Sequence, residues 1–478
     1  MKNFSPPITK KPPTCDVINS IKESWWRPLL PSLLTTALLL PPSFAQGEIC
    51  NNCQTLSQTV QQALETDATL AAAHQLRRQS GYQIDSARAV LLPQVSLNLG
   101  YGQHHEQGRG LTAERQSGYT HYEQQSASLE LSQALFNAAD WYRYQAAQSA
   151  DQQAQVALEA ARQDLILRSS QAWFDVLRQQ DALNTHKNEL DALQQDWQQT
   201  RYRHAAGLVV ALEVQEAQSR IDLTRAALLQ SRNNLQLARL QLQQLTGIET
   251  AELAPLTYLP LLPHHDVQHW LALANQHNPA LRQNNAAELQ ARLDWQASRA
   301  EHLPTVTLQA SLSREIEDAW KYSDDNTGLP LDTNSRYIGI EIAVPIYEGG
   351  GLHAGRRAAA AGLAYQQQQS RLQQQILTTR IHSLHAQLEN QQASIQARQQ
   401  ALHSANQTLA ATEAAWRTGL RRFVDVLDAR QQQYEAYRDL SASHYDYLTS
   451  WLSLHREAGV LDTSVISRLE QALQNQPT

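Results

Sequence analysis

The hydrophobic and polar positions of the chain repeat with two different periods. In the longer segments, apolar or small residues recur in alternating steps of three and four, most clearly at Val214, Ala217, Ile221, Thr224, Leu228, Ser231, Leu235, Ala238, Leu242 and Leu245. A period of 3.5 residues indicates a helix in a supercoiled seam. Because neither Gly nor Pro occurs at positions 119–206 or 363–418, we expect unusually long helices there.

Four shorter segments alternate with a period of two and predict β-strands, at about 94–102, 125–135, 305–313 and 336–345. One face of each is apolar, and the other carries small, hydroxyl or carboxylate residues, among them Glu130 and Glu341. A sheet over a soluble core gives the same alternation, but the predicted helices are too long and too polar to cover it. Each segment also reaches the ~9–11 residues of a transmembrane strand. We therefore expect a membrane barrel with Glu130 and Glu341 in its lumen.

The chain contains the same unit twice. Leu92–Leu97 is repeated as Leu303–Leu308, and the motif of Gly207 with Glu213 is repeated with Gly419 and Asp425. A repeat of this length indicates two copies of one supersecondary assembly. Within each copy we expect helix, strand, strand, long helix and helix, with the first helix at about 55–91 or 267–302. The predicted divisions are 1–45 (leader), 46–247 (first repeat), 248–266 (linker), 267–459 (second repeat) and 460–478 (tail).

The N-terminus is typical of a secretory signal peptide over residues 1–45. Basic residues precede an apolar core at Leu29–Leu40, and the small-residue pattern Ser43–Ala45 follows. No later stretch is long and apolar enough for a membrane helix, so we expect none after Ala45. Cys50 and Cys53 remain after cleavage, in a compartment where disulfides persist. They form either a local disulfide or two free thiols.

The net charge of −7 becomes more negative when the basic leader is removed. An acidic chain of this kind argues against nucleic acid as a partner, because phosphate binding needs a basic face. No nucleophile–base constellation stands on a strand-to-helix turn, so we expect no enzyme. No histidine pair has further ligands at metal spacing, and we expect neither a metal nor a cofactor.

Four strands cannot close a barrel, because unpaired backbone groups in lipid cost several kcal/mol each. The smallest bacterial barrels have eight strands. Closure therefore requires several chains, with eight strands from a dimer or twelve from a trimer. The strand count alone does not choose between these.

Several segments resemble the TolC family of outer-membrane export channels: Leu92-Pro93, Ser132–Phe136, Val344–Gly350, both Gly-x5-acidic-Val hairpins and, most closely, Gly419–Ala429. The resemblance covers about 55–460 and implies a mainly α fold with a β-barrel part. It implies a homotrimer with a twelve-stranded barrel in the bacterial outer membrane and a twelve-helix tunnel in the periplasm. An equatorial belt would come from about 248–266 and the tail. The implied partners are outer-membrane lipid, a periplasmic adaptor (membrane fusion) protein and an inner-membrane pump of the ABC, RND or MFS type.

The same resemblance places a periplasmic gate at the two hairpins. Asp425 and Asp428 stand three apart on one helix face, so a trimer would gather six carboxylates that favour cations. The family's gate positions match Trp416, Arg421, Asp425, Asp428, Leu212 and Glu213, and the hairpin turns match Gly207 and Gly419. Glu213 stands where the family has Asp, so a pair with Arg421 is expected. Leu212 replaces a Thr and removes one polar contact of the family gate.

The alternative function is a non-conducting coiled-coil tether or stalk in the periplasm. Long helices poor in Gly and Pro fit both functions, whereas the four alternating strands favour the duct, because a stalk needs none. Drug efflux, type I protein secretion and metal export all remain open as the cargo.

Overall fold

The computed structural model describes residues 54–108, 118–249, 253, 262, 265–318, 321–322, 326–327 and 330–474, all within one compact unit, Asn51–Thr478. The predicted leader (1–45) and Cys50 and Cys53 lie outside these residues. The elements are α1 (Leu56–Thr66), α2 (Ala68–Ala89), β1 (Gln94–Gly108), β2 (Gly118–Phe136), α3 (Ala138–Ala205), α4 (Ala211–Thr246), α5 (Val267–His277), α6 (Pro279–Ala300), β3 (Thr305–Glu317), β4 (Lys321–Tyr322), β5 (Asn326–Thr327), β6 (Leu331–Ala343), α7 (Gly351–Arg417), α8 (Phe423–Glu457) and α9 (Thr463–Gln474).

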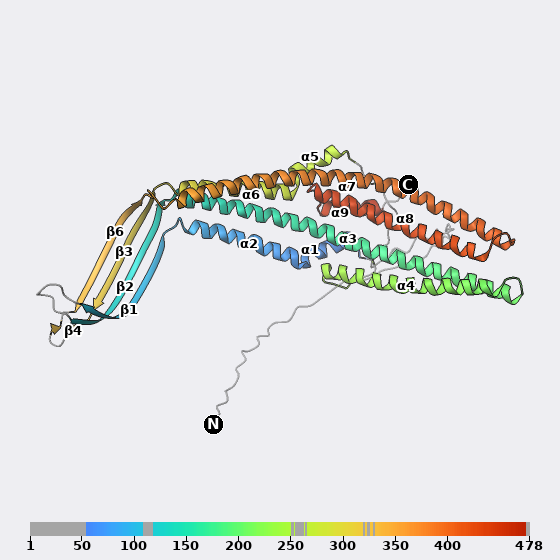
Figure 1. Ribbon diagram of the computed structural model, residues 1–478, viewed down its shortest axis with the longest axis horizontal. Helices are drawn as coiled ribbons and strands as arrows, with labels where there is room; N and C mark the ends of the chain where they lie inside the picture. Colours follow the sequence, from blue (N-terminus) through green and yellow to red (C-terminus); the bar gives the residue numbers. More distant parts are fainter. Residues whose placement is uncertain are drawn as a thin grey trace, which may run out of the picture. The chain divides into compact units, whose positions relative to one another are not determined.

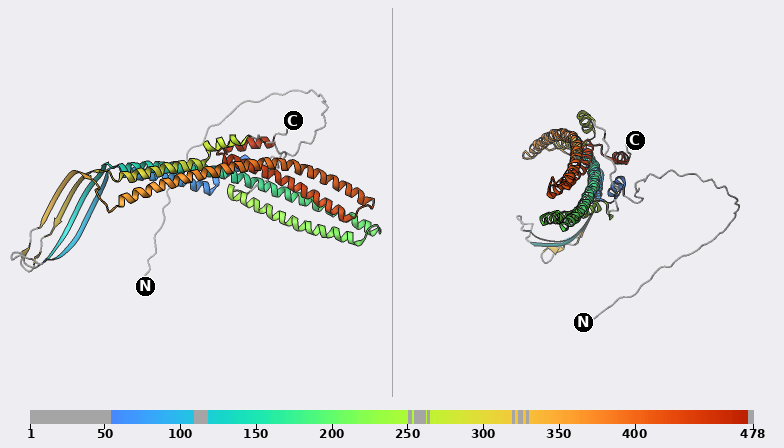
Figure 2. Two further views of the ribbon diagram at one scale, coloured as in Figure 1. Left: turned by 45° about the horizontal axis from the view of Figure 1, so that its top comes forward. Right: turned by 90° about the vertical axis from the view of Figure 1, so that its right-hand side faces the viewer.

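Two long helices, α3 and α7, organise the helical part: α3 packs against α2, α4, α6 and α8, and α7 packs against α6 and α8 (Figure 1). Near the strands the packing order is α7–α6–α3–α2, and toward the hairpins it is α7–α8–α3–α4. At 1.5 Å per residue, α3 and α7 each extend for about 100 Å. Viewed end-on, α7, α8, α3 and α4 follow a curved arc, so the helical layer has a concave face (Figure 2).

The predicted seam on α4 is confirmed. The buried residues of this helix are Ala217, Ile221, Thr224, Leu228, Ser231, Leu235, Ala238, Leu242 and Thr246, which keep the alternating steps of three and four as far as Leu242. They face α3, against which α4 packs along its length. The small residues of the seam allow this close approach, as the sequence indicated.

The first helix of each half is broken, contrary to the continuous helices expected at 55–91 and 267–302. Asp67 ends α1 and begins α2, where its Oδ1 accepts a hydrogen bond of 2.9 Å from the Leu70 amide. Asn278 does the same between α5 and α6, with 3.0 Å to the Leu281 amide. Both residues are strong N-caps, and Pro279 at N1 starts its helix. The apolar periodicity continues across each break and therefore hides it.

The four long strands form an antiparallel sheet in the order β1-β2-β3-β6 (Figure 1). Leu97 pairs with Leu129, and Leu129 pairs with Leu312. Every strand runs further from the helices than the predicted ranges, as β1 continues to Gly108. The additional segments are mostly polar, with isolated apolar residues such as Ile316 and Leu331, so they carried no clear alternation. Short strands β4 and β5 extend the sheet at β2.

Three apolar clusters hold the described helices together. The largest lies where α1, α3, α4, α5, α7, α8 and α9 meet and includes Phe174, Ile381 and Leu452. A small one joins α1, α2 and α3 through Ala63, Leu70 and Leu165. The remaining one lies at the hairpins and is described below. None of the helices within the described residues combines the length and the apolar character needed to cross a bilayer.

Candidate functional site

The two hairpins, α3–α4 and α7–α8, reverse the chain in the same way. Gly207 and Gly419 adopt φ angles of 74° and 77°, in the left-handed region that favours glycine. The amide after each glycine donates to a carbonyl five residues earlier, Leu208 to Arg203 and Leu420 to Ala415, both at 2.9 Å. This is the Schellman motif, which satisfies the last carbonyls of α3 and α7. The predicted turn glycines therefore end both long helices.

A shared apolar cluster joins the hairpins to each other. It consists of Leu193, Ala217, Ile221, Leu409, Trp416, Phe423, Val426, Leu427 and Ala429. Trp416 is 7% exposed, and its ring centroid lies 5.1 Å from that of Phe423. The Arg203 guanidinium of α3 lies over the same ring at 4.3 Å, which is a cation–π contact. Trp416, expected at the gate, thus anchors one hairpin on the other.

Asp425 stabilises the start of α8. Its Oδ2 accepts a hydrogen bond of 3.2 Å from the Arg422 amide. The guanidinium groups of Arg421 and Arg422 lie 3.9 and 3.6 Å from the same carboxylate. A carboxylate in the first turn also interacts favourably with the helix dipole. Within one protomer, therefore, Asp425 is a helix-capping residue.

Glu213 and Arg421 do not meet in the described part of the chain, where Arg421 faces Asp425 instead. Glu213 lies in the first turn of α4, and its buried Oε2 has no hydrogen-bond partner among the described residues. Burial, the largest influence, raises the pKa of the Glu213 carboxyl, and Arg203 opposes this rise. Neighbouring Leu212 is 63% exposed. Glu213 is therefore a carboxylate with unused bonding capacity near a tip.

Asp428 links the two hairpins. Its Oδ1 lies 2.6 Å from Nη2 of Arg220 on α4, and Arg220 also contacts Gln431. The sequence predicted that Asp428 shares a helix face with Asp425 but did not reveal Arg220. The two residues are 208 positions apart, and both belong to helices rich in charged side chains.

A second set of ion pairs, also missed from the sequence, runs along the contact between α3 and α8. Arg430 lies 2.9 Å from Asp196 and 2.7 Å from Glu413 of α7. Arg438 lies 3.0 Å from Glu189. Burial, the largest influence, raises the pKa of Asp196, while Arg430 opposes that rise. Separating the two hairpins would break the Arg430–Asp196 and Arg438–Glu189 pairs, whereas the Arg430–Glu413 pair lies within the α7–α8 hairpin.

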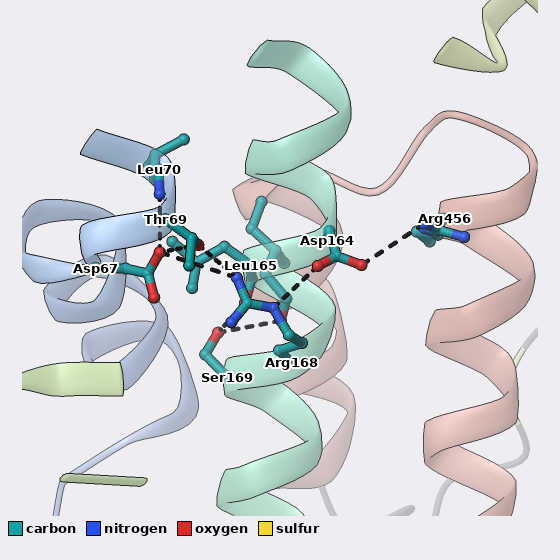
Figure 3. A network of polar contacts seen from close by, with 9 residues as sticks. Asp67, Thr69, Leu70, Asp164, Leu165, Arg168, Ser169 and Arg456 are labelled. Atoms are coloured by element: carbon teal, nitrogen blue, oxygen red, sulfur yellow. Dashed lines mark hydrogen bonds and ion pairs between the residues drawn. The ribbon is translucent and has the colours of Figure 1, made fainter. Parts of the chain in front are cut away.

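A similar network lies at the junction of α1, α2, α3 and α8 (Figure 3). Arg168 of α3 donates 2.9 Å hydrogen bonds to Asp164 and to Thr69. Arg456 of α8 lies 3.6 Å from the other oxygen of Asp164. Asp67, the cap between α1 and α2, lies 3.9 Å from Arg168. The helix break and the α3–α8 contact are therefore tied together.

The sheet has one polar and one apolar face. Glu130 and Glu341 share the polar face, where Glu130 accepts a 3.2 Å hydrogen bond from Ser128 and Glu341 accepts one from Gln309. The opposite face exposes large apolar side chains, at Val95, Leu97, Leu99, Tyr101, Leu129, Leu312, Ile338, Ile340 and Ile342. Soluble proteins rarely expose a contiguous patch of this extent.

No group of three or more His, Cys, Asp or Glu side chains has metal-binding geometry within the described ranges. The arrangement instead offers a polar sheet face, a concave helical layer and two hairpins held by breakable polar contacts. These features belong to a conduit.

Comparison with known proteins agrees with this arrangement. The family profile described as "Outer membrane efflux protein" matches residues 59–248 and again 270–460. The chain is 30% identical to the proteases secretion protein PrtF of Dickeya chrysanthemi, over 93% of this chain and 95% of that protein. It is also 30% identical to the outer membrane protein TolC of Escherichia coli K12, over 93% and 89%.

The fold is likewise that of a solved outer-membrane protein. VceC of Vibrio cholerae superposes with a TM-score of 0.71 at 20% sequence identity, over 84% of this chain and 96% of that one. By their names these relatives are efflux, secretion and outer membrane proteins, which favours the duct over the tether. The chain therefore belongs to the outer membrane efflux protein family, as a protein of the bacterial outer membrane that serves as an export duct.

Proposed function

We propose that three copies of the chain form one continuous conduit, with a twelve-stranded barrel in the outer membrane and a twelve-helix tunnel in the periplasm. The observation that carries this proposal is the sheet with one exposed apolar face and one polar face. Among the described strands, β1 pairs only with β2 and β6 only with β3, which leaves two edges to be paired. Since lipid cannot satisfy such edges, neighbouring copies supply the partners.

The division into two structural repeats, 46–247 and 267–459, belongs to this proposal. The family profile matches the chain twice, over 59–248 and 270–460, which supports a duplicated unit. Each repeat would give two strands to the barrel and one helical hairpin to the tunnel. The segment at 248–266 and the tail at 460–478 would form the belt between them, with the leader at 1–45 removed on export.

The polar faces would line the path of the cargo. Glu130 and Glu341 would lie in the barrel lumen, where three copies give six carboxylates. The cargo would be handed over by an inner-membrane pump through a periplasmic adaptor protein. One relative, PrtF, is by its name a secretion protein for proteases, which favours protein cargo as one use of the duct.

The hairpins would close the periplasmic entrance. Trp416 anchors the α7–α8 hairpin, while Asp425 and Asp428 carry the negative charge at the tip. Within one protomer Arg421 faces Asp425, and Glu213 keeps an unpartnered buried oxygen. We therefore assign the expected Arg421–Glu213 contact to the boundary between neighbouring protomers. Opening would separate the hairpins and break this contact.

Reconstitution into planar bilayers tests both proposals. A duct predicts discrete single-channel conductance from a species with three times the protomer mass, and a folded trimer without conductance would refute it. In the Arg421→Ala channel we expect higher conductance, because the closed entrance loses a contact. Arg232→Ala is the matched control, since this exposed α4 arginine has no ion pair among the described residues. Unchanged conductance of Arg421→Ala would refute the proposed Arg421–Glu213 contact and leave the duct itself untouched.

A further inference from the structure

The apolar face of the sheet ends along an oblique line. Moving away from the helices, the first polar residue on this face is Arg336 after Ile338 on β6, Arg314 after Leu312 on β3, Gln125 after Ala127 on β2, and Gln103 after Tyr101 on β1. On β3 a single apolar residue, Ile316, lies beyond this point. The register pairs Ile338 with Ala310, Arg314 with Ala127, and Gln125 with Tyr101. From β6 through β3 and β2 to β1, the boundary therefore lies two residues farther from the helices on each successive strand.

This step has a geometric meaning for a sheet in a membrane. Two residues span ~6.8 Å along a strand, and neighbouring strands lie ~4.8 Å apart. The line is therefore inclined by about 55° to the direction perpendicular to the strands. Transmembrane strands are tilted by ~35–45°, which brings such a line close to the membrane plane. On the proposed barrel, which this inference requires, the line marks the edge of the hydrocarbon layer farthest from the helices. Arg336 lies at this edge.

Arg336 is an exposed cation without a counter-ion among the described residues. The nearest carboxylate on its own strand face, Asp332, is held by Arg314 through bonds of 3.1 Å from Nε and 2.8 Å from Nη2. The residue opposite Arg336 is Leu312. No ion pair of Arg336 is recorded within the residues that the structure describes. The charge of Arg336 therefore remains available to an external anion.

Two grooves meet at Arg336. The first, of about 530 Å³, crosses Ala310, whose small side chain lies between Leu131, Leu312 and Ile338. The second, of about 550 Å³, contains Arg314 and Asn334 as well as Arg336. An apolar groove thus continues into one of mixed character, lined by both apolar and polar residues, with Arg336 in the lining of both.

We propose that this surface binds a phosphate-bearing anionic lipid of the outer leaflet. One acyl chain occupies the groove over Ala310, and the phosphate accepts hydrogen bonds from the Arg336 guanidinium and the Asn334 amide. The guanidinium fork matches phosphate geometry. An arginine at the hydrocarbon edge keeps its stem in the apolar layer and its charge at the headgroups. A zwitterionic lipid with the same acyl chain has no net negative charge for Arg336 to select.

Native mass spectrometry of the purified full-length protein tests the site. The probes are diphosphorylated lipid A, phosphatidylcholine as the zwitterionic lipid, and inorganic phosphate as the free anion. We expect the wild type to retain lipid A at least fivefold more than Arg336→Gln and more than it retains phosphatidylcholine. Ala310→Leu, which fills the apolar groove and keeps the charge, should also lower retention. Arg232→Gln on α4 removes a charge far from the sheet and should retain lipid A as the wild type does.

Several results would overturn the site. They are equal retention of lipid A by Arg336→Gln and wild type, equal retention of lipid A and phosphatidylcholine by the wild type, and complete competition by inorganic phosphate. The strand content and the planar-bilayer conductance of each variant are also measured, so that a folding failure is recognised. If Arg336→Gln fails to fold, the retention of lipid A by Ala310→Leu decides instead. A wild type that conducts but shows no lipid selection refutes the site alone. A folded wild type that does not conduct refutes the duct.

Discussion

The Nε atom of Arg430 on α8 lies 2.9 Å from Oδ2 of Asp196 on α3. A second carboxylate, that of Glu413 on α7, lies 2.7 Å from Nη2 of the same guanidinium. All three side chains are at most 27% exposed. One cation thus holds three helices together just above the hairpins, and two carboxylates depend on it.

Arg430→Met should therefore destabilise the helical part strongly. Removing the cation leaves two neighbouring, partly buried carboxylates unpaired, and breaking a buried pair costs roughly 3–5 kcal/mol. We expect a lower midpoint of thermal unfolding, followed by circular dichroism at the helix band. The matched control is Arg225→Met, which removes an exposed i,i+3 pair with Asp222 at 3.1 Å and should cost under about 1 kcal/mol. Equal midpoints for the two variants would contradict the assigned role of Arg430.

The sequence contained most of the architecture because each part of it repeats locally. The seam from Ala217 to Leu242 and the alternation from Val95 to Tyr101 are both visible within a dozen neighbouring residues or so. What escaped prediction had no local periodic signal. The breaks at Asp67 and Asn278 lie within continuous apolar patterns and depend on single capping side chains.

The partners of the site residues could not be read from the sequence for a different reason. The Gly207 and Gly419 turns are local and were predictable, whereas Asp428 and Arg220 meet only once two helices have a fixed axial register. Both helices carry many arginines, aspartates and glutamates, so composition does not select a pair. Asp425 is a local case, since its amide partner lies three residues away in the sequence.

Acid should destabilise the helix packing around His455 of α8. Burial, the largest influence, lowers the pKa of this imidazole from 6.5 to about 4. Because the unfolded chain then binds more protons than the folded one between pH 6.5 and 4, stability is lost as the pH falls through that window. The loss approaches about 3 kcal/mol below pH 4, at 1.36 kcal/mol per pKa unit. Thermal midpoints measured from pH 7 to pH 4 report it.

His455→Phe isolates this effect from other acid-sensitive groups. The ring can remain beside Trp270, whose centroid lies 4.8 Å away, but it no longer titrates. We expect a smaller drop in the thermal midpoint between pH 6.5 and pH 4 for this variant than for the wild type. An identical drop would show that another group, such as His444, whose pKa is also lowered by burial, accounts for the acid sensitivity.

Two turn glycines should respond differently to alanine. Gly419 has φ 77° and open space around the position of a Cβ, so Gly419→Ala pays only left-handed strain of ~1–2 kcal/mol. At Gly459, φ is 76° and a Cβ would stand 2.3 Å from the His277 carbonyl oxygen. Gly459→Ala should therefore lower the thermal midpoint at least twice as much. Gly362→Ala, in an open position inside α7, is the control and should raise it, since Ala exceeds Gly in helix propensity by ~1 kcal/mol.

The Arg220–Asp428 pair should affect channel closure more than folding. Its side chains are 26% and 56% exposed, so the pair adds at most about 1 kcal/mol to stability. It nevertheless joins α4 to α8 directly, across the line along which the hairpins would part. In a double-mutant cycle of Arg220→Ala and Asp428→Ala, we expect nearly unchanged thermal midpoints but increased closed-state conductance in planar bilayers for each single variant. The double variant should leak no more than either single one. Fully additive increases in leak would instead mean that the two residues act separately and that their 2.6 Å contact does not hold the entrance closed.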